Sequence, residues 1–144
     1  MSNEIVETIA STDIVESGRN QAGAIRSSID MSTKEGKLAV LNAVQSAEPL
    51  EEHLNEEFSL KNIVMQAVQV VASTTGELVD ATRTILVTEG GDAYTTVSDT
   101  VAKDIVTIMS IMGNPEDWGG ALTVKVEAVK GNRGRFYKLI TVNK

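Results

Sequence analysis

The spacing of apolar residues along the chain predicts two helices and five strands. Apolar residues recur every three or four positions over residues 38–47 and again over residues 101–112, which is the spacing of one helical face. Ser32 followed by Glu35 has the form of a capping box, so the first helix is expected to begin there and to end before Pro49. Segments rich in β-branched residues predict strands at residues 63–72, 78–88, 93–97, 121–129 and 135–142.

Glycine-containing segments separate these elements and favour tight turns. Gly76 is expected to supply a positive φ between the first two strands, and Gly90 with Gly91 to form the next hairpin turn. Ser98 or Asp99 is expected to cap the start of the second helix, and Gly113 is placed to end it. Residues 131–134 are placed to join the last two strands. The order α-β-β-β-α-β-β is that of an OB-fold with an additional N-terminal helix. We therefore predict a mainly β protein, a five-stranded OB-fold β-barrel with helices, although other α+β folds share this order.

The chain has the length of one domain. Its 144 residues are too few for two well-packed domains, and 42% of them are apolar, which is enough for a core. Residues 1–31 show no sustained periodicity, so we expect a flexible N-terminal arm. Residues 32–144 are expected to form the OB-fold domain.

The distribution of charge is more informative than its total. The net charge is −7, which by itself argues against a partner that is a polyanion. Residues 121–144, however, carry six cationic residues and one acidic residue, a net charge of +5, while the first 120 residues carry −12. Because the local field decides where a polyanion docks, the C-terminal segment is a candidate binding surface. The alternative is that these cations only decorate solvated strands.

The side chains of the chain give little support to an enzyme. There is no cysteine, which excludes disulfides and thiolate zinc sites, and the one histidine, His53, lies among acidic residues. Neither a nucleophile elbow nor a Gly-rich phosphate loop is present. We expect no catalysis, no metal and no cofactor. The N-terminus does not resemble a signal peptide and no apolar run could span a bilayer, so we expect a soluble intracellular protein without a membrane partner.

The candidate binding residues gather where OB barrels bind ligands, on the second and third strands and beside the loop between the fourth and fifth. Single strands are bound without sequence preference by cations along the backbone and aromatic faces for the bases. Phe136 and Tyr137 are neighbours on one strand and face opposite sides, and the alternation leaves open which of them meets a ligand. The candidate nucleic-acid-binding residues are Arg83, Tyr94, Trp118, Lys125, Lys130, Asn132, Arg133, Arg135, Phe136, Tyr137 and Lys138.

Within this set, Arg133 and Arg135 are expected to contact phosphates and Tyr94 to stack on a base. Two of the aromatic residues have a structural alternative. Tyr94 would then be a residue of the barrel rim, and Trp118 a ring that covers the end of the barrel beneath the second helix.

Several segments follow one another along residues 32–144: KLAVLNA (37–43), LEEHL (50–54), YTTVSD (94–99), GNP (113–115) with Trp118, and KGNRGRFYKL (130–139). Their order and spacing resemble those of the single-stranded DNA-binding proteins of phages that infect Gram-positive bacteria. The resemblance covers residues 32–144 and implies a protein that coats single-stranded DNA in phage DNA replication or recombination, in the host cytoplasm, without catalysis or cofactor. Gly119 and Gly120 depart from it, because a proline-containing run is expected after Trp118.

Two other functions are compatible with the same sequence. One is a phage structural or protein-interaction module with an OB-like barrel, in which the basic hairpin is incidental. The other is mimicry of a polynucleotide by the acidic N-terminal third. The sequence leaves open whether the chain forms a homo-oligomer, whether it prefers DNA or RNA, and which replication or recombination proteins are its partners.

Overall fold

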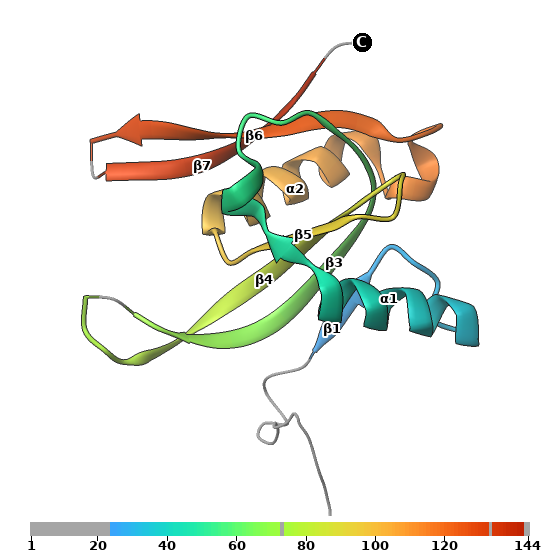
Figure 1. The fold of residues 1–144 in the computed structure, drawn as a ribbon, viewed down its shortest axis with the longest axis horizontal. Coiled ribbons are helices and arrows are strands. Elements are labelled where there is room, and N and C mark those ends of the chain that lie inside the picture. Colours follow the sequence, from blue (N-terminus) through green and yellow to red (C-terminus); the bar gives the residue numbers. More distant parts are fainter. Residues whose placement is uncertain (1–23, 73, 133, 143–144) are drawn as a thin grey trace, which may run out of the picture. The chain divides into compact units, whose positions relative to one another are not determined.

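A computed structural model describes residues 24–72, 74–132 and 134–142 of the chain (Figure 1). It confirms a mostly β, OB-like fold, in which a curled half-barrel sheet is accompanied by two α-helices. The elements are β1 (Ile25–Ser27), α1 (Lys34–Ser46), β2 (Glu48–Pro49), the 3₁₀ turn η1 (Leu50–His53), β3 (Phe58–Val71), β4 (Leu78–Thr88), β5 (Ala93–Thr96), α2 (Asp99–Met112), the 3₁₀ turn η2 (Pro115–Asp117), β6 (Leu122–Gly131) and β7 (Gly134–Thr141).

The five predicted strands correspond to β3–β7 and the two predicted helices to α1 and α2. The first of these strands begins at Phe58, five residues before the expected start. β1 and β2 were not predicted, because three and two residues are too few to show a periodic pattern. β1 lies inside the segment that was expected to be a flexible arm, and residues 1–23 of that segment lie outside the described residues.

The strands follow the order β2-β5-β4-β3-β6-β7, and β1 pairs with β3. The pairings of β3 with β6, of β4 with β5 and of β6 with β7 are antiparallel. β2 runs parallel to β5, with Glu48 opposite Tyr94. This short parallel pairing joins the acidic segment after α1 to the edge of the sheet.

The chain divides into two compact units, and β3 and β4 each run from one into the other. The first unit contains residues 24–26 and 65–83, which include the outer half of the β3–β4 hairpin. Its turn is closed by a hydrogen bond from the amide of Ala72 to the carbonyl of Glu77, and Gly76 has the positive φ that was predicted (74°). Val71 and Leu78 are each 65% exposed in this hairpin.

The second unit contains residues 27–64 and 84–142 of the described chain. Its helix α1 begins one residue later than the capping-box prediction. Thr33, and not Ser32, caps the helix through a hydrogen bond from the amide of Gly36 to Thr33 Oγ1 (3.0 Å). The amide of Ser32 instead donates to the carboxylate of Asp30 (2.9 Å), which holds Ser32 outside the helix.

The buried face of α1 is also not the apolar face, over residues 38–47, from which the helix was predicted. Leu38 and Leu41 are 46% and 47% exposed, whereas the buried residues of the helix are Gly36, Val40 and Ala43. A Cβ added to Gly36 would lie 1.7 Å from the carbonyl oxygen of Asp30, so the preceding loop approaches the helix at this point. The core cluster on this side of the sheet comprises Val40, Ala43, Val64, Ile85 and Ala93.

Helix α2 agrees with the prediction at both ends. Ser98 caps it by accepting a hydrogen bond from the amide of Val101, and Gly113 ends it with a positive φ of 84°. Val101 and Ile105 on its apolar face are fully buried. Met112, at the end of the predicted face, is 43% exposed, because burial decreases toward the C-terminus of the helix.

Candidate nucleic-acid interface

The register of the β6–β7 hairpin decides which side of the sheet each candidate residue faces. Lys130 is opposite Arg135, Ala128 opposite Tyr137 and Val126 opposite Leu139. Directly opposed residues of an antiparallel pair share a face, and Val126 and Leu139 are buried. Lys130, Arg135 and Tyr137 therefore share the face that continues into the core.

The other face of the hairpin carries Phe136. This residue is opposite Val129, and its neighbour Lys138 is opposite Glu127. Phe136 is 39% exposed, while Tyr137 is half-buried. A Cβ on Gly131 would lie only 3.0 Å from Phe136 Cε1, so the absence of a side chain at Gly131 makes room for this ring. Phe136 is thus the more accessible of the two rings between which the sequence could not decide.

The cations of the hairpin are mostly accessible. Lys130, Arg135 and Lys138 are exposed, as is the neutral Asn132 between them. Lys125 is less available, because its ammonium group forms an ion pair with Glu127 (3.2 Å). Arg133 lies outside the described residues.

Tyr94 lies in a different environment from the hairpin. Its ring lies against that of His53 at a centroid distance of 4.4 Å, with the two planes tilted by 35°, and meets the ring of Phe58 edge-on at 5.1 Å. Phe58 is opposite Val124, which is six residues from Lys130 along β6, or about 20 Å in an extended strand. The structure therefore does not bring Tyr94 together with the cationic end of the hairpin.

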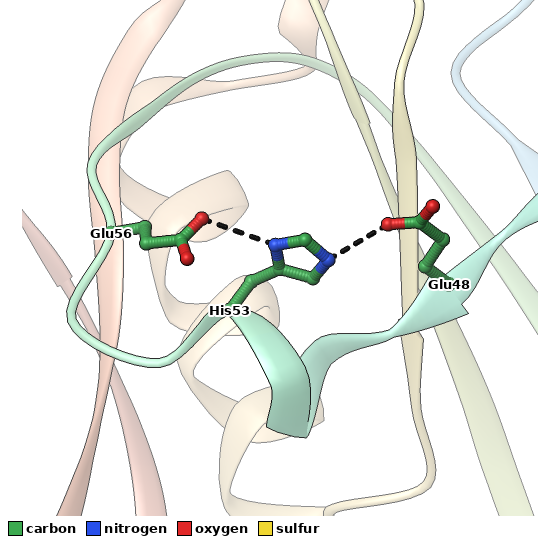
Figure 2. A network of polar contacts seen from close by, with 3 residues as sticks. All are labelled: Glu48, His53 and Glu56. Carbon is green, nitrogen blue, oxygen red and sulfur yellow. Dashed lines mark hydrogen bonds and ion pairs between the residues drawn. The ribbon is translucent and has the colours of Figure 1, made fainter.

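The surroundings of Tyr94 are acidic. Figure 2 shows His53 between two carboxylates, with Nε2 2.8 Å from Glu48 and Nδ1 3.1 Å from Glu56. Partial burial raises the pKa of Tyr94, and the charges of Asp92, Glu56 and Glu48 raise it further. The hydrogen bond with Glu56 is the main cause of the raised pKa of His53, and Glu48 adds to it. This cluster presents negative charge around a ring that was predicted to stack on DNA.

The two remaining candidates have structural partners of their own. Trp118 follows η2, is half-buried, and donates a hydrogen bond from Nε1 to the carbonyl of Gly113 (2.8 Å). Arg83 belongs to the first unit, where its guanidinium lies 3.5 Å from the side-chain oxygen of Gln66. Partial burial lowers the pKa of Arg83.

Three residues of α2 that lie beside the β6–β7 hairpin were not among the candidates predicted from the sequence. Thr100 and Asp104 form hydrogen bonds with the backbone of β7, and Lys103 lines a pocket beside Phe136. Thr100 and Asp104 are 37 and 35 residues from their partners on β7 in the sequence. The available signal was the polar pair Thr100 and Asp104, which lie four residues apart and directly precede the buried Val101 and Ile105.

Two general features of the described part of the chain bear on function. No group of three or more histidine or acidic side chains there could hold a metal ion. None of its helices is long and apolar enough to cross a membrane.

An OB-like half-barrel with a cationic hairpin and an exposed aromatic ring is an arrangement typical of proteins that bind nucleic acid. Comparison with protein families gives the particular class. The model of the family described as phage single-stranded DNA-binding protein matches residues 19–143. The chain therefore belongs to the phage single-stranded DNA-binding protein family. Comparisons with curated proteins and with solved structures gave no match.

Proposed function

We propose that this protein binds single-stranded DNA without sequence preference during phage DNA replication in the host cytoplasm, and that recombination uses the same activity. Membership of the family supports this function. The structural observation that carries it is the C-terminal hairpin, where Lys130, Arg135 and Lys138 are exposed and the ring of Phe136 is accessible on the face that also carries Lys138. The activity is binding alone, with no chemical step and no cofactor.

The hairpin would combine two modes of contact. Lys130, Arg133, Arg135 and Lys138 neutralise phosphates, and Phe136 stacks on a base, which contributes about 1–3 kcal/mol. Asn132 and the adjacent glycine amides can donate hydrogen bonds to phosphate oxygens. Tyr137 supports the hairpin from its core side. Tyr94, Trp118 and Lys125 are proposed as secondary contacts within the second unit. Arg83 is proposed as a separate contact of the first unit.

Salt titration with oligo-dT tests the proposal. If Z phosphates are neutralised, the logarithm of the affinity falls with the logarithm of the salt concentration at a slope of about −0.7Z. Arg133→Ala and Arg135→Ala should each weaken binding equally for all sequences and reduce this slope by about 0.7. Phe136→Ala should weaken binding about 5- to 150-fold with little change in slope, because stacking releases no counterions. An absence of binding to oligo-dT at low salt would refute the proposal.

Exposed apolar residues favour a second function, a protein-interaction module. Val71 and Leu78 are each 65% exposed and Val79 is 40% exposed in the β3–β4 hairpin of the first unit. Such residues are typical of surfaces that contact other proteins, here a second copy of the chain or a replication or recombination protein. Val71→Ser with Leu78→Ser should leave the affinity for short oligo-dT unchanged if this hairpin serves only protein contacts. Loss of the affinity for oligo-dT in this variant would instead mean that the β3–β4 hairpin contacts DNA.

A further inference from the structure

Helix α2 covers the outer edge of β7 through side chains that replace a neighbouring strand. The hydroxyl of Thr100 donates a hydrogen bond to the carbonyl of Tyr137. One helical turn later, the carboxylate of Asp104 accepts a hydrogen bond from the amide of Leu139 (3.0 Å). These two groups satisfy backbone positions that an edge strand would otherwise leave open. The side of α2 that carries Lys103 is thereby held next to the hairpin.

A pocket of about 260 Å³ lies at this junction. α2 contributes Lys103 to its lining, β6 contributes Val129, and β7 contributes Phe136 and Lys138. Lys103 and Lys138 are exposed, and Val129 is half-buried. The pocket therefore combines an aromatic ring and an aliphatic side chain with two cationic groups.

We propose that this pocket holds one nucleotide of the single-stranded DNA, with the base against Phe136 and Val129 and its phosphate between Lys103 and Lys138. Pockets for drug-sized ligands are about 300–1,000 Å³, so a slightly smaller pocket suits a single base. The two ammonium groups match the charge of a phosphodiester, and the aromatic ring accepts any base. The proposal rests on the proposed function and extends the DNA path from the hairpin onto α2.

Asp104 determines how the nucleotide enters. Asp104 is one of the residues that line the pocket, and its carboxylate is anchored to the amide of Leu139, so a phosphate placed beside that carboxylate would be repelled. The phosphate therefore lies at the rim with the two lysines, and the base occupies the interior.

Substitution of Lys103 tests the cationic half of the pocket. Lys103→Gln should reduce the salt slope for oligo-dT by about 0.7, which corresponds to a loss of affinity of about 8-fold at 50 mM salt and about 3-fold at 200 mM. Lys37→Gln on α1 is the matched control, because it removes the same charge from an exposed helical position. If the two variants have the same affinity and salt slope for oligo-dT while the wild-type protein binds it, the proposed nucleotide pocket is wrong. The proposed function would still stand.

The aromatic half is tested by moving the ring without removing it. Gly131→Ala places a methyl group against Phe136, and Gly131 does not have a positive φ, so its backbone can accept alanine. Gly90→Ala is the control, because its nearest neighbour would be 3.8 Å away. The wild-type protein should bind an oligonucleotide with abasic sites more weakly than oligo-dT, and Gly131→Ala should reduce that difference while Gly90→Ala keeps it. An unchanged difference in Gly131→Ala would overturn the stacking role, and a wild-type protein that binds neither oligonucleotide would overturn the proposed function as well.

Discussion

At the scale of single residues, His53 shows how an exposed acidic segment is held to the sheet. Its ring lies against the ring of Tyr94 and is bonded on both sides to carboxylates, Glu48 from β2 and Glu56 from the loop before β3. The imidazole is only 21% exposed, while both carboxylates are about 60% exposed. In its protonated form His53 can donate to both carboxylates at once.

Stability should therefore depend on the protonation of His53. The pKa of His53 in the folded protein is raised above 6.5, its ordinary value. A raised pKa means that the stabilisation is fully present below about pH 6.5 and is lost as the pH rises through the higher pKa of the folded state. Since the chain has one histidine, its NMR titration can be followed without ambiguity. His53→Gln should remove this pH dependence of the free energy of unfolding, and a titration at or below 6.5 would contradict the double contact.

Gly36 is a position in helix α1 that requires glycine because there is no room for a side chain. In an exposed helical position alanine is more stable than glycine by about 1 kcal/mol. At Gly36 a methyl group would collide with the carbonyl of Asp30. Gly36→Ala should therefore lower the free energy of unfolding by about 1–3 kcal/mol, which is the usual cost of overpacking. Urea denaturation measures this, with Lys37→Ala as a control that should change stability little. A more stable Gly36→Ala protein would show that the loop does not approach α1.

At the scale of elements, the contact between α2 and β7 positions the binding hairpin. Thr100→Val keeps the shape of the side chain but removes the hydroxyl that bonds to Tyr137, and should lower the free energy of unfolding by about 1 kcal/mol. Thr107→Val on the same helix is the control, because the Thr107 hydroxyl bonds only within the helix, to the carbonyl of Lys103. Hydrogen exchange at the amide of Leu139 should become faster in Thr100→Val alone. Equal exchange in both variants would mean that α2 does not hold the edge of β7.

At the scale of the whole molecule, binding depends on where the charge lies. Combined substitution of Lys130, Arg135 and Lys138 by glutamine removes three of the predicted phosphate contacts and should reduce the salt slope by about 2. Substitution of Lys34, Lys37 and Lys61 by glutamine gives the same net charge, and these three lysines are also exposed. The second variant should bind oligo-dT almost as the wild-type protein does. Similar losses in both variants would show that the total charge, and not the hairpin, governs binding.

The sequence by itself determined the kinds and order of the main elements. The limits of β4 and α2 agree with the prediction, because turn glycines, the Ser98 cap and Gly113 act on the few residues beside them. The charge asymmetry that indicated the hairpin is likewise a property of composition. Short strands such as β2 were not predictable, because a two-residue strand exists only through its partner β5.

The tertiary structure decided which faces and which distant residues meet. The side taken by Phe136 depends on the register of β6 against β7, since a shift of one residue would exchange Phe136 with Tyr137. The exposure of Leu38 follows from the close packing of Gly36 against the preceding loop, which turns the small-residue face of α1 inward. Lys103 reaches the hairpin only because α2 is bonded to the edge of β7. Local propensities act over a few residues, whereas these choices depend on contacts between residues far apart in the chain.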